Sequence, residues 1–323
     1  MPGNDPLKGI LLILIGMACI SVNDVLIKQL SGDYPLHQMI FVRSTIGIVF
    51  SLVVVQFEGG WRILRTSTPG LHLIRGLLVV MANMTYFTAL AVLPLANATA
   101  LFFVAPLMIT LLSIPLLGEK VGGRRIGAVI VGFLGVILMV RPGSSVAESV
   151  PSVLVLGLPV LAALFYALMQ IMTRKLGIAS KPSALAVYIQ STFIVVSGLF
   201  WLVAGDGRLA EGLTDESLIF LLREWVWPAE DDRVLFGALG LVSGVIGYTL
   251  SRAYSNADAA VVAPFEYTNL VLAVVWGWIF FGHLPGLDTW MGIALIMGSG
   301  IYVFVREHIR QRPVASRRPQ RRH

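Results

Sequence analysis

Long hydrophobic runs, each ended by a short polar or glycine- and proline-rich stretch, recur from one end of this chain to the other. Each run has about 20 residues, the length an α-helix needs to cross roughly 30 Å of hydrocarbon. The first run is too long for a signal-peptide core, and no A-x-A pattern follows it, so we expect it to remain as a span. We predict ten membrane-spanning helices, at residues 7–30, 36–56, 71–92, 96–117, 123–140, 152–173, 182–204, 232–255, 259–281 and 286–306.

The composition excludes an ordinary soluble protein. Of the 323 residues, 56% are hydrophobic and only 13% are charged, and the mean hydropathy is +0.82. Soluble domains carry charge on about a quarter of their residues. The single cysteine, Cys19, lies in the first span, so the chain has no intramolecular disulfide and no cysteine cluster for a metal.

The distribution of lysine and arginine predicts the orientation in the membrane. If the N-terminus is cytoplasmic, 16 of the 24 basic residues fall on the cytoplasmic side and four on the other side, and the rest lie in or at the ends of spans. Short basic loops are retained in the cytoplasm, so we expect both termini there. The net charge of +6 is then a consequence of topology, and we expect no nucleic-acid partner.

Two segments outside the spans also have predictable roles. The basic tail at 307–323 is expected to contact anionic lipid head groups from the cytoplasm. In the loop at 205–231 on the other side, the apolar stretch 218–222 is too short to cross the membrane. Trp225 and Trp227 follow it, so we predict an interfacial helix with an aromatic anchor.

The chain repeats itself. The turn that ends the fourth predicted span, Leu116–Glu119, is similar to the one that ends the ninth, Phe280–His283. Earlier in each half, Arg43–Thr45 corresponds to Gln190–Thr192, and Asp24 corresponds to Gln170. Five spans is an odd number, so the second half must insert upside down. We predict an all-α membrane protein of ten transmembrane helices in two inverted five-helix repeats, 1–145 and 146–306; the alternative is chance similarity between apolar helices.

These residues also carry a resemblance to a known family. The run from Pro106 to Glu119, the glycine-rich fifth span that ends Val140–Pro142 and the segment Val262–Thr268 resemble the EamA-type branch of the drug/metabolite transporter superfamily. The resemblance covers nearly the whole chain and implies an inner-membrane carrier of a small metabolite. Members of the family move amino acids, nucleosides, riboflavin, S-adenosylmethionine or drugs. His283 departs from the family's turn, which usually carries Glu.

Two shorter segments are similar to the S-adenosylmethionine carriers of that superfamily. They are Asn23–Val25 in the first span and Arg75–Leu78 at the start of the third. The inverted repeat predicts alternating access between the halves. We expect a substrate that is small and polar or amphipathic.

Charged residues inside the spans are candidates for the transport pathway, because unpaired charge in hydrocarbon is costly. In the outer half, Asp24 and Lys28 lie four residues apart on one helical face and can form an ion pair. Arg43 enters from the same side at a depth of roughly 10 Å. These residues, with Asn23, form either a gate or a static link between the first two spans.

A second charged group is predicted in the inner half. Glu266 lies in the ninth span, and Arg252 and Arg75 lie at similar depth at the ends of the eighth and third spans. A carboxylate whose partner changes as the halves rock could couple transport to a proton. The alternatives are a static pair between Glu266 and Arg252, and a role for Arg75 as an anchor at the cytoplasmic surface.

Neutral polar residues complete the candidate site. Amides and phenols in the spans can orient a polar solute and cover its flat faces, or they can simply join helices. The candidates are Asn83, Tyr86, Tyr166, Gln170, Tyr188, Gln190, Tyr248, Tyr267 and Asn269. We expect Trp276 and Trp278 to belong to the aromatic belt at the outer surface.

No motif of ATP hydrolysis, zinc hydrolysis or serine hydrolysis is present, so we predict a carrier and not an enzyme. We expect no cofactor and no metal. The predicted partners are a small-molecule substrate, the lipid bilayer and protons or a counter-substrate, with the chain a monomer or a homodimer. An intramembrane enzyme and a channel or receptor remain as alternative classes.

Overall fold

The computed structural model describes residues 6–118, 121–141, 143–145, 153–176, 181–256 and 262–311. Within these ranges the chain is helical, with no β-strand, and ten of its segments are long and apolar enough to cross a membrane, as predicted. Most of the predicted basic tail, at 312–323, lies outside the described residues. The helices are α1 (Pro6–Leu30), α2 (Leu36–Glu58), α3 (Pro69–Val92), α4 (Leu95–Phe102), α5 (Ala105–Leu117), α6 (Gly123–Val140), α8 (Val153–Leu176), α9 (Pro182–Ala204), α10 (Glu216–Leu222), α11 (Glu230–Asn256), α13 (Thr268–Phe281) and α14 (Leu287–Gln311).

Two of the predicted spans are not continuous helices. The fourth span is divided into α4 and α5, which meet at a turn at residues 103 and 104. In the ninth span, a 3₁₀ helix, Ala263–Tyr267, precedes α13. Pro106 and Pro264 lie at these two breaks, and proline removes a backbone donor and crowds the preceding turn. The pattern of apolar residues gave the extent of both spans, and the prolines indicated that these two helices could be kinked.

The turn that the sequence repeats is the same structure in both halves. Gly118 ends α5 with φ 69° and ψ 21°, and Gly282 ends α13 with φ 66° and ψ 11°. This left-handed conformation closes a helix and strongly favours glycine. The repeated glycine is therefore explained by its backbone geometry.

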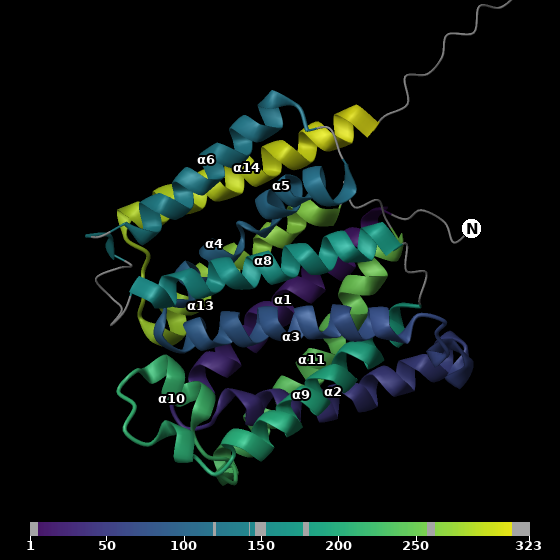
Figure 1. The fold of residues 1–323 in the computed structure, drawn as a ribbon, viewed down its shortest axis with the longest axis vertical. Coiled ribbons are helices and arrows are strands. Elements are labelled where there is room, and N and C mark those ends of the chain that lie inside the picture. The colour runs from purple at the N-terminus through teal and green to yellow at the C-terminus, as the bar shows by residue number, and fades with distance from the viewer. Residues whose placement is uncertain are drawn as a thin grey trace, which may run out of the picture.

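The helices pack in a pattern that is unchanged when the corresponding spans of the two halves are exchanged. The first span, α1, packs against the eighth, α11, just as the sixth, α8, packs against the third, α3. The second and seventh spans, α2 and α9, pack against each other, and so do the fifth and tenth, α6 and α14 (Figure 1). The chain therefore consists of two interlocked, inverted five-helix repeats.

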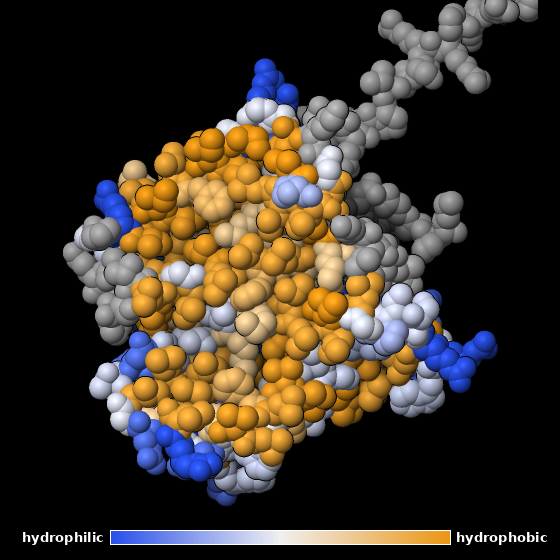
Figure 2. Space-filling view, viewed as in Figure 1, coloured by the Kyte–Doolittle hydropathy of each residue, from blue (hydrophilic) through white to orange (hydrophobic). Residues whose placement is uncertain are grey.

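The surface has the belt expected of a membrane protein. Figure 2 shows hydrophobic residues over the middle of one face and hydrophilic residues gathered at its edges. Large apolar side chains such as Val53, Leu202 and Val234 are exposed on the helices, at 52%, 70% and 73%. The α10 segment lies at the opposite end of the bundle from the end of α14 (Figure 1). We call these the outer and inner ends, following the predicted orientation.

The predicted helix in the outer loop is present as α10. Asp215 caps it by accepting hydrogen bonds from the backbone N–H groups of Ser217 and Leu218. Phe220 is buried against the bundle, whereas Trp227 is 86% exposed. The loop is fastened to the start of α2, where the Gln38 amide donates to the Val226 carbonyl at 2.6 Å.

Candidate transport site

A buried polar network joins the first four spans in the outer half of the bundle. Asp24 of α1 accepts hydrogen bonds from Asn23 at 3.3 Å and from the Tyr86 hydroxyl at 3.2 Å. The Tyr86 hydroxyl also lies 3.1 Å from the Thr99 hydroxyl of α4. Asn23 and Asp24 are each 4% exposed. The sequence predicted Asn23, Asp24 and Tyr86, but gave no reason to select Thr99.

Arg43 lies at the centre of this network and at the boundary between the halves. Its guanidinium donates to the side-chain oxygens of Asn23 at 3.0 Å and Asn83 at 2.9 Å. It also lies between the rings of Phe87 and Phe193, 5.2 and 5.3 Å from their centroids. Phe193 belongs to α9 of the second half. Asn23 therefore bridges the Arg43 cation and the Asp24 carboxylate.

Lys28 does not form the ion pair with Asp24 that the sequence allowed. Its ammonium donates to the carbonyls of Leu90 and Leu93 at 2.8 Å each, where α3 ends. The last carbonyls of a helix have no intrahelical partner, and a cation there also interacts favourably with the helix dipole. Lys28 therefore holds the turn between α3 and α4.

A row of aromatic rings runs from this network toward the second half. The ring centroid of Phe102 lies 5.4 Å from that of Tyr86 and 5.6 Å from that of Tyr166 on α8. Phe102 is the last residue of α4 and packs against both large hydrophobic clusters of the core. The break in the fourth span thus places a ring between the third and sixth spans.

The next residue, Phe103, stacks on Tyr267 with 5.0 Å between the ring centroids. These two residues correspond to each other in the repeat, because the turns of the two halves are 164 positions apart. Residues that a two-fold axis exchanges can touch only close to that axis. The breaks in the fourth and ninth spans therefore meet at the pseudo-two-fold axis. Sequence reasoning missed both Phe102 and Phe103, although the repeat offset pairs Phe103 with Tyr267.

A smaller polar group lies at the far end of the aromatic row. The Gln170 amide donates to the Tyr166 hydroxyl at 2.8 Å. The same hydroxyl interacts electrostatically with Glu266 and with Arg75. The Arg75 Nε is buried without a hydrogen-bond partner among the described residues. Tyr166 thus lies near two of the predicted inner charges, and no ion pair between Arg252 and Glu266 is found in the described part of the chain.

The remaining predicted residues are dispersed. Tyr188 donates to the Leu64 carbonyl at 2.8 Å near the inner end, and Gln190 donates to Ser243 at 3.2 Å between α9 and α11. Tyr248 is half-buried in α11. The buried Tyr267 hydroxyl and the buried Asn269 Oδ1 have no hydrogen-bond partner among the described residues.

The two tryptophans predicted for the aromatic belt differ from each other. Trp278 is 59% exposed, as a belt residue would be. Trp276 is partly buried against the core, and its indole N–H donates to the hydroxyl of Ser21 on α1 at 3.1 Å. Among the described residues, no three His, Cys, Asp or Glu side chains gather where they could hold a metal ion.

Comparison with known proteins matches both halves. The sequence profile of the EamA-like transporter family matches residues 7–141 and 153–305. An S-adenosylmethionine uptake transporter of Rickettsia prowazekii is 26% identical, covering 94% of this chain and 96% of its own. A riboflavin transporter of Vibrio cholerae is 31% identical over 93% and 94%, and a pseudopaline exporter of Pseudomonas aeruginosa is 30% identical over 91% and 95%.

A solved crystal structure shares the fold. It matches with a TM-score of 0.61 at 20% identity, covering 94% of this chain and 98% of the other. Ten spans in two matching halves around a buried polar network define a multi-pass membrane transporter of small metabolites. The chain belongs to the EamA-like transporter family.

Proposed function

We propose that this transporter carries a flat, polar metabolite through the midplane of the bundle, at the Tyr86–Phe102–Tyr166 row. The observation that carries the proposal is the position of this row, which lies between two polar groups at the break in the fourth span. Transporter sites of inverted-repeat folds lie near the midplane, where helices are interrupted. Aromatic rings there can cover the flat face of a solute.

The polar groups at the ends of the row would hold the polar edges of the solute. On the outer side these groups are Asp24 and Arg43, and on the inner side they are Arg75, Gln170 and Glu266. The two ends differ in charge and shape, so they would fix the direction in which an asymmetric solute binds. The relatives named for S-adenosylmethionine and riboflavin support this class, because both compounds combine a flat ring system with a polar chain.

Alternating access would be coupled to protons or to exchange of a counter-substrate. Asp24 shares the Tyr86 hydroxyl with Thr99, so a change in its protonation would alter a contact between the first, third and fourth spans. Glu266 lies beside the pseudo-two-fold contact of Tyr267. Both carboxylates are therefore placed to favour one arrangement of the halves over the other.

The proposed function includes the membrane location, the orientation and the oligomeric state of the protein. The halves are 1–145 and 146–306, the protein is in the inner membrane with both termini cytoplasmic, and it acts as a monomer or homodimer. The charge of the loops supports the orientation. The solute would leave the membrane chemically unchanged, as it does with a carrier and not with an enzyme.

Uptake into proteoliposomes tests the proposal. The labelled panel is S-adenosylmethionine, riboflavin, tryptophan and a purine nucleoside, with glutamate as a solute that has no ring. We expect saturable flux of one ring compound, unchanged on recovery, and a KM at least about tenfold higher in Phe102→Ala. The matched control is Phe57→Ala, because Phe57 is 86% exposed at the end of α2.

The coupling is tested in the same vesicles with an imposed pH gradient. Flux that loses its pH dependence in Asp24→Asn or Glu266→Gln assigns the coupling carboxylate. Exchange that is insensitive to pH in the wild type and both variants would make these carboxylates structural. Flux of glutamate alone, or a KM unchanged by Phe102→Ala, would contradict the proposed site.

A further inference from the structure

The two arginines inside the spans of the first half differ in how they are bonded. Arg43 of α2 donates to the side-chain oxygens of Asn23 and Asn83. Arg75 of α3 is half-buried, its Nε is fully buried, and its guanidinium has no hydrogen-bond acceptor among the described residues. A charge without a partner is costly inside a membrane. The described chain therefore leaves the Arg75 cation open to an acceptor that a ligand can supply.

Arg75 is directed into the bundle and not toward lipid. It lies 11 residues before Tyr86, about three turns of helix, so the two side chains share one face of α3. Tyr86 is buried, and α8 packs along α3 (Figure 1). The opposite face of α3 carries the exposed side chains of Leu73, Ile74, Leu77 and Met81. Arg75 is thus on the side of α3 that borders the proposed pathway.

Arg75 meets the aromatic row at Tyr166, where the row ends. The Arg75 guanidinium interacts electrostatically with the Tyr166 hydroxyl. That hydroxyl accepts a hydrogen bond from the Gln170 amide at 2.8 Å and donates its own proton to no described residue. The guanidinium and the phenol are therefore two unused donors at the same end of the row.

The charges beside these donors favour an acceptor with a single negative charge. Glu266 also interacts with the Tyr166 hydroxyl, and it is engaged in a further interaction of its own. Its carboxylate would repel a doubly charged phosphate more strongly than a singly charged group. The fork of N–H donors on a guanidinium matches the two oxygens of a carboxylate. A carboxylate is thus the acceptor that fits this end of the row.

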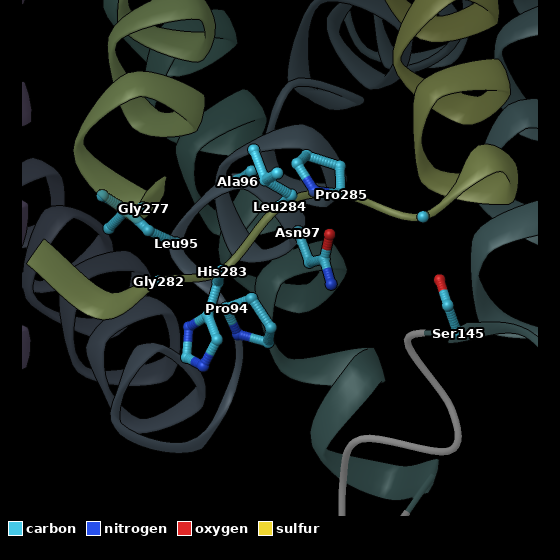
Figure 3. A pocket seen from close by; sticks show the side chains of 11 residues that line it. Pro94, Leu95, Ala96, Asn97, Ser145, Gly277, Gly282, His283, Leu284 and Pro285 are labelled. Carbon is cyan, nitrogen blue, oxygen red and sulfur yellow. The ribbon is translucent and has the colours of Figure 1, made fainter. Parts of the chain in front are cut away.

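The pocket at the outer end of the bundle offers no such cation. It has a volume of about 270 Å³ and lies between the start of α4 and the loop from Gly282 to Gly286 (Figure 3). None of its 11 lining residues is Asp, Glu, Lys or Arg. A contact between opposite charges is therefore available to a carboxylate at Arg75 and not in this pocket.

We propose that Arg75 and Tyr166 bind a carboxylate of the transported solute. The carboxylate oxygens accept from the Arg75 guanidinium and from the Tyr166 hydroxyl, while the rings of Tyr166 and Phe102 cover the flat part of the solute. Arg75 then selects acids over neutral compounds of the same shape. This inference rests on the proposed function, because it names the group that binds at one end of the same aromatic row.

Two probes that differ only in the acidic group test the selection. Radiolabelled indole-3-acetate and indole-3-acetamide are bound to the full-length protein in nanodiscs of phosphatidylcholine, a lipid without net charge. At neutral pH the acid is ionised. We expect the acid to bind at least about tenfold more tightly than the amide, because hydrogen bonds to charged groups are the stronger ones. Equal affinities, tighter binding of the amide or no binding of the acid would overturn the proposal.

Matched variants assign the preference to Arg75. Arg75→Gln breaks no hydrogen bond to a described residue, so we expect the fold to persist and the affinity for the amide to be unchanged. Its affinity for the acid should fall about tenfold or more, and Arg75→Lys should restore part of it by keeping the charge. The control is Arg62→Gln, at an exposed arginine of the inner end. A preference kept in Arg75→Gln, or lost equally in Arg62→Gln, would rule out the site.

A lipid phosphate is the other anion that could reach Arg75. The measurement is therefore repeated with phosphatidylglycerol replacing part of the phosphatidylcholine. We expect wild type to keep its preference for the acid relative to Arg75→Gln in the same lipid. Loss of this difference in the anionic lipid would assign Arg75 to a lipid head group and overturn the proposal.

Failure of this inference can be distinguished from failure of the proposed function. Phe102→Ala should weaken the binding of both probes, because the ring contact does not depend on charge. In the uptake panel, tryptophan and S-adenosylmethionine carry a carboxylate, whereas riboflavin and the purine nucleoside carry none. We expect flux of a carboxylate compound and a KM about tenfold higher in Arg75→Gln. Flux of riboflavin or the nucleoside alone, weakened by Phe102→Ala, would support the aromatic site and overturn the carboxylate.

Discussion

The two halves of this transporter have the same fold but different chemistry. In the first half, Asp24 and Arg43 form a buried charged network, whereas their counterparts in the second half are Gln170 and Gln190. Within the described residues, the second pair makes only neutral hydrogen bonds, to Tyr166 and to Ser243. An inverted repeat therefore does not need a symmetric site. The helical scaffold is shared by the two halves, whereas the buried polar residues at corresponding positions differ.

The shared part is maintained by close packing at small residues. A Cβ at Gly76 of α3 would overlap the Thr192 side chain of α9, and a Cβ at Gly240 of α11 would overlap the Ile46 side chain of α2. These glycines correspond to each other in the repeat. Gly135 and Gly292 likewise allow α6 and α14 to approach closely. The geometry of the halves is thus set at glycines, away from the polar groups.

The largest expected loss of stability comes from removing the charge of Arg43 in the first half. Arg43→Leu leaves Asp24 without its nearby cation and leaves the Asn23 and Asn83 oxygens without their donor. Breaking a buried charged group in this way costs about 3–5 kcal/mol. We expect a large drop in the midpoint of thermal unfolding in detergent, and loss of uptake.

The counterpart in the second half supplies the control. Gln190→Leu removes one neutral hydrogen bond to Ser243, and such bonds contribute about 1 kcal/mol or less in membranes. A drop in unfolding midpoint as large as that of Arg43→Leu would mean that the halves do not differ in this way.

The sequence predicted the symmetric features well, but it indicated the breaks only as possible kinks at prolines and gave none of the contacts made there. Span positions, the Gly118 and Gly282 turns and the relation of the halves follow from local rules, because hydrophobic length and backbone conformation are properties of neighbouring residues. The form of the breaks at Pro106 and Pro264 depends on packing against other helices, which are distant in the sequence. No spacing in the sequence shows that Phe102 would lie between Tyr86 and Tyr166.

The sequence was enough to select the charged candidates, but it was not enough to predict which groups they contact. Asp24, Arg43 and Glu266 are conspicuous because charge is rare in spans. An ion pair between Lys28 and Asp24 was possible because they are four residues apart, yet the Lys28 ammonium donates to carbonyls at the end of α3. A long side chain can reach another helix as easily as its own next turn. Spacing along one helix could not decide between the two.

A smaller effect tests the shared scaffold. Gly76→Ala and Gly240→Ala each add a methyl group where a neighbouring side chain already lies, and overpacking typically costs about 1–3 kcal/mol. We expect similar drops in thermal stability from both variants, because the two glycines correspond in the repeat and each would meet a β-branched side chain of the facing helix, Thr192 or Ile46. The control is Gly157→Ala in α8, where nothing lies within 4 Å and alanine should be neutral or stabilising by up to about 1 kcal/mol. Unequal drops at Gly76 and Gly240 would show that the packing is as asymmetric as the charges.

The smallest expected loss of stability comes from removing the cap of α10, in a loop that differs between the halves. The loop between α9 and α11 contains the capped helix α10, whereas the corresponding loop between α2 and α3 contains only a 3₁₀ turn, Gly60–Leu64, which has no side-chain cap. Asp215→Ala should loosen α10 by about 1 kcal/mol, while Asp215→Asn should retain most of the cap. Hydrogen exchange at the Ser217 and Leu218 amides measures the difference.

The same cap should depend on pH in a defined direction. The hydrogen bond from the Ser217 hydroxyl, together with the backbone bonds, holds the pKa of Asp215 below its usual value. A lowered pKa in the folded state means that the carboxylate stabilises α10 above about pH 4, the pKa of free aspartate, and that this contribution is lost as the pH falls through the lower folded value. The amides of Ser217 and Leu218 should exchange more slowly in wild type than in Asp215→Ala. This difference should be constant near neutral pH and should become smaller in acid. A difference that persists unchanged at pH 2 would mean that the protonated Asp215 side chain caps α10 as well as the carboxylate does. No difference at any pH would mean that α10 is held by the burial of Phe220 and not by its cap.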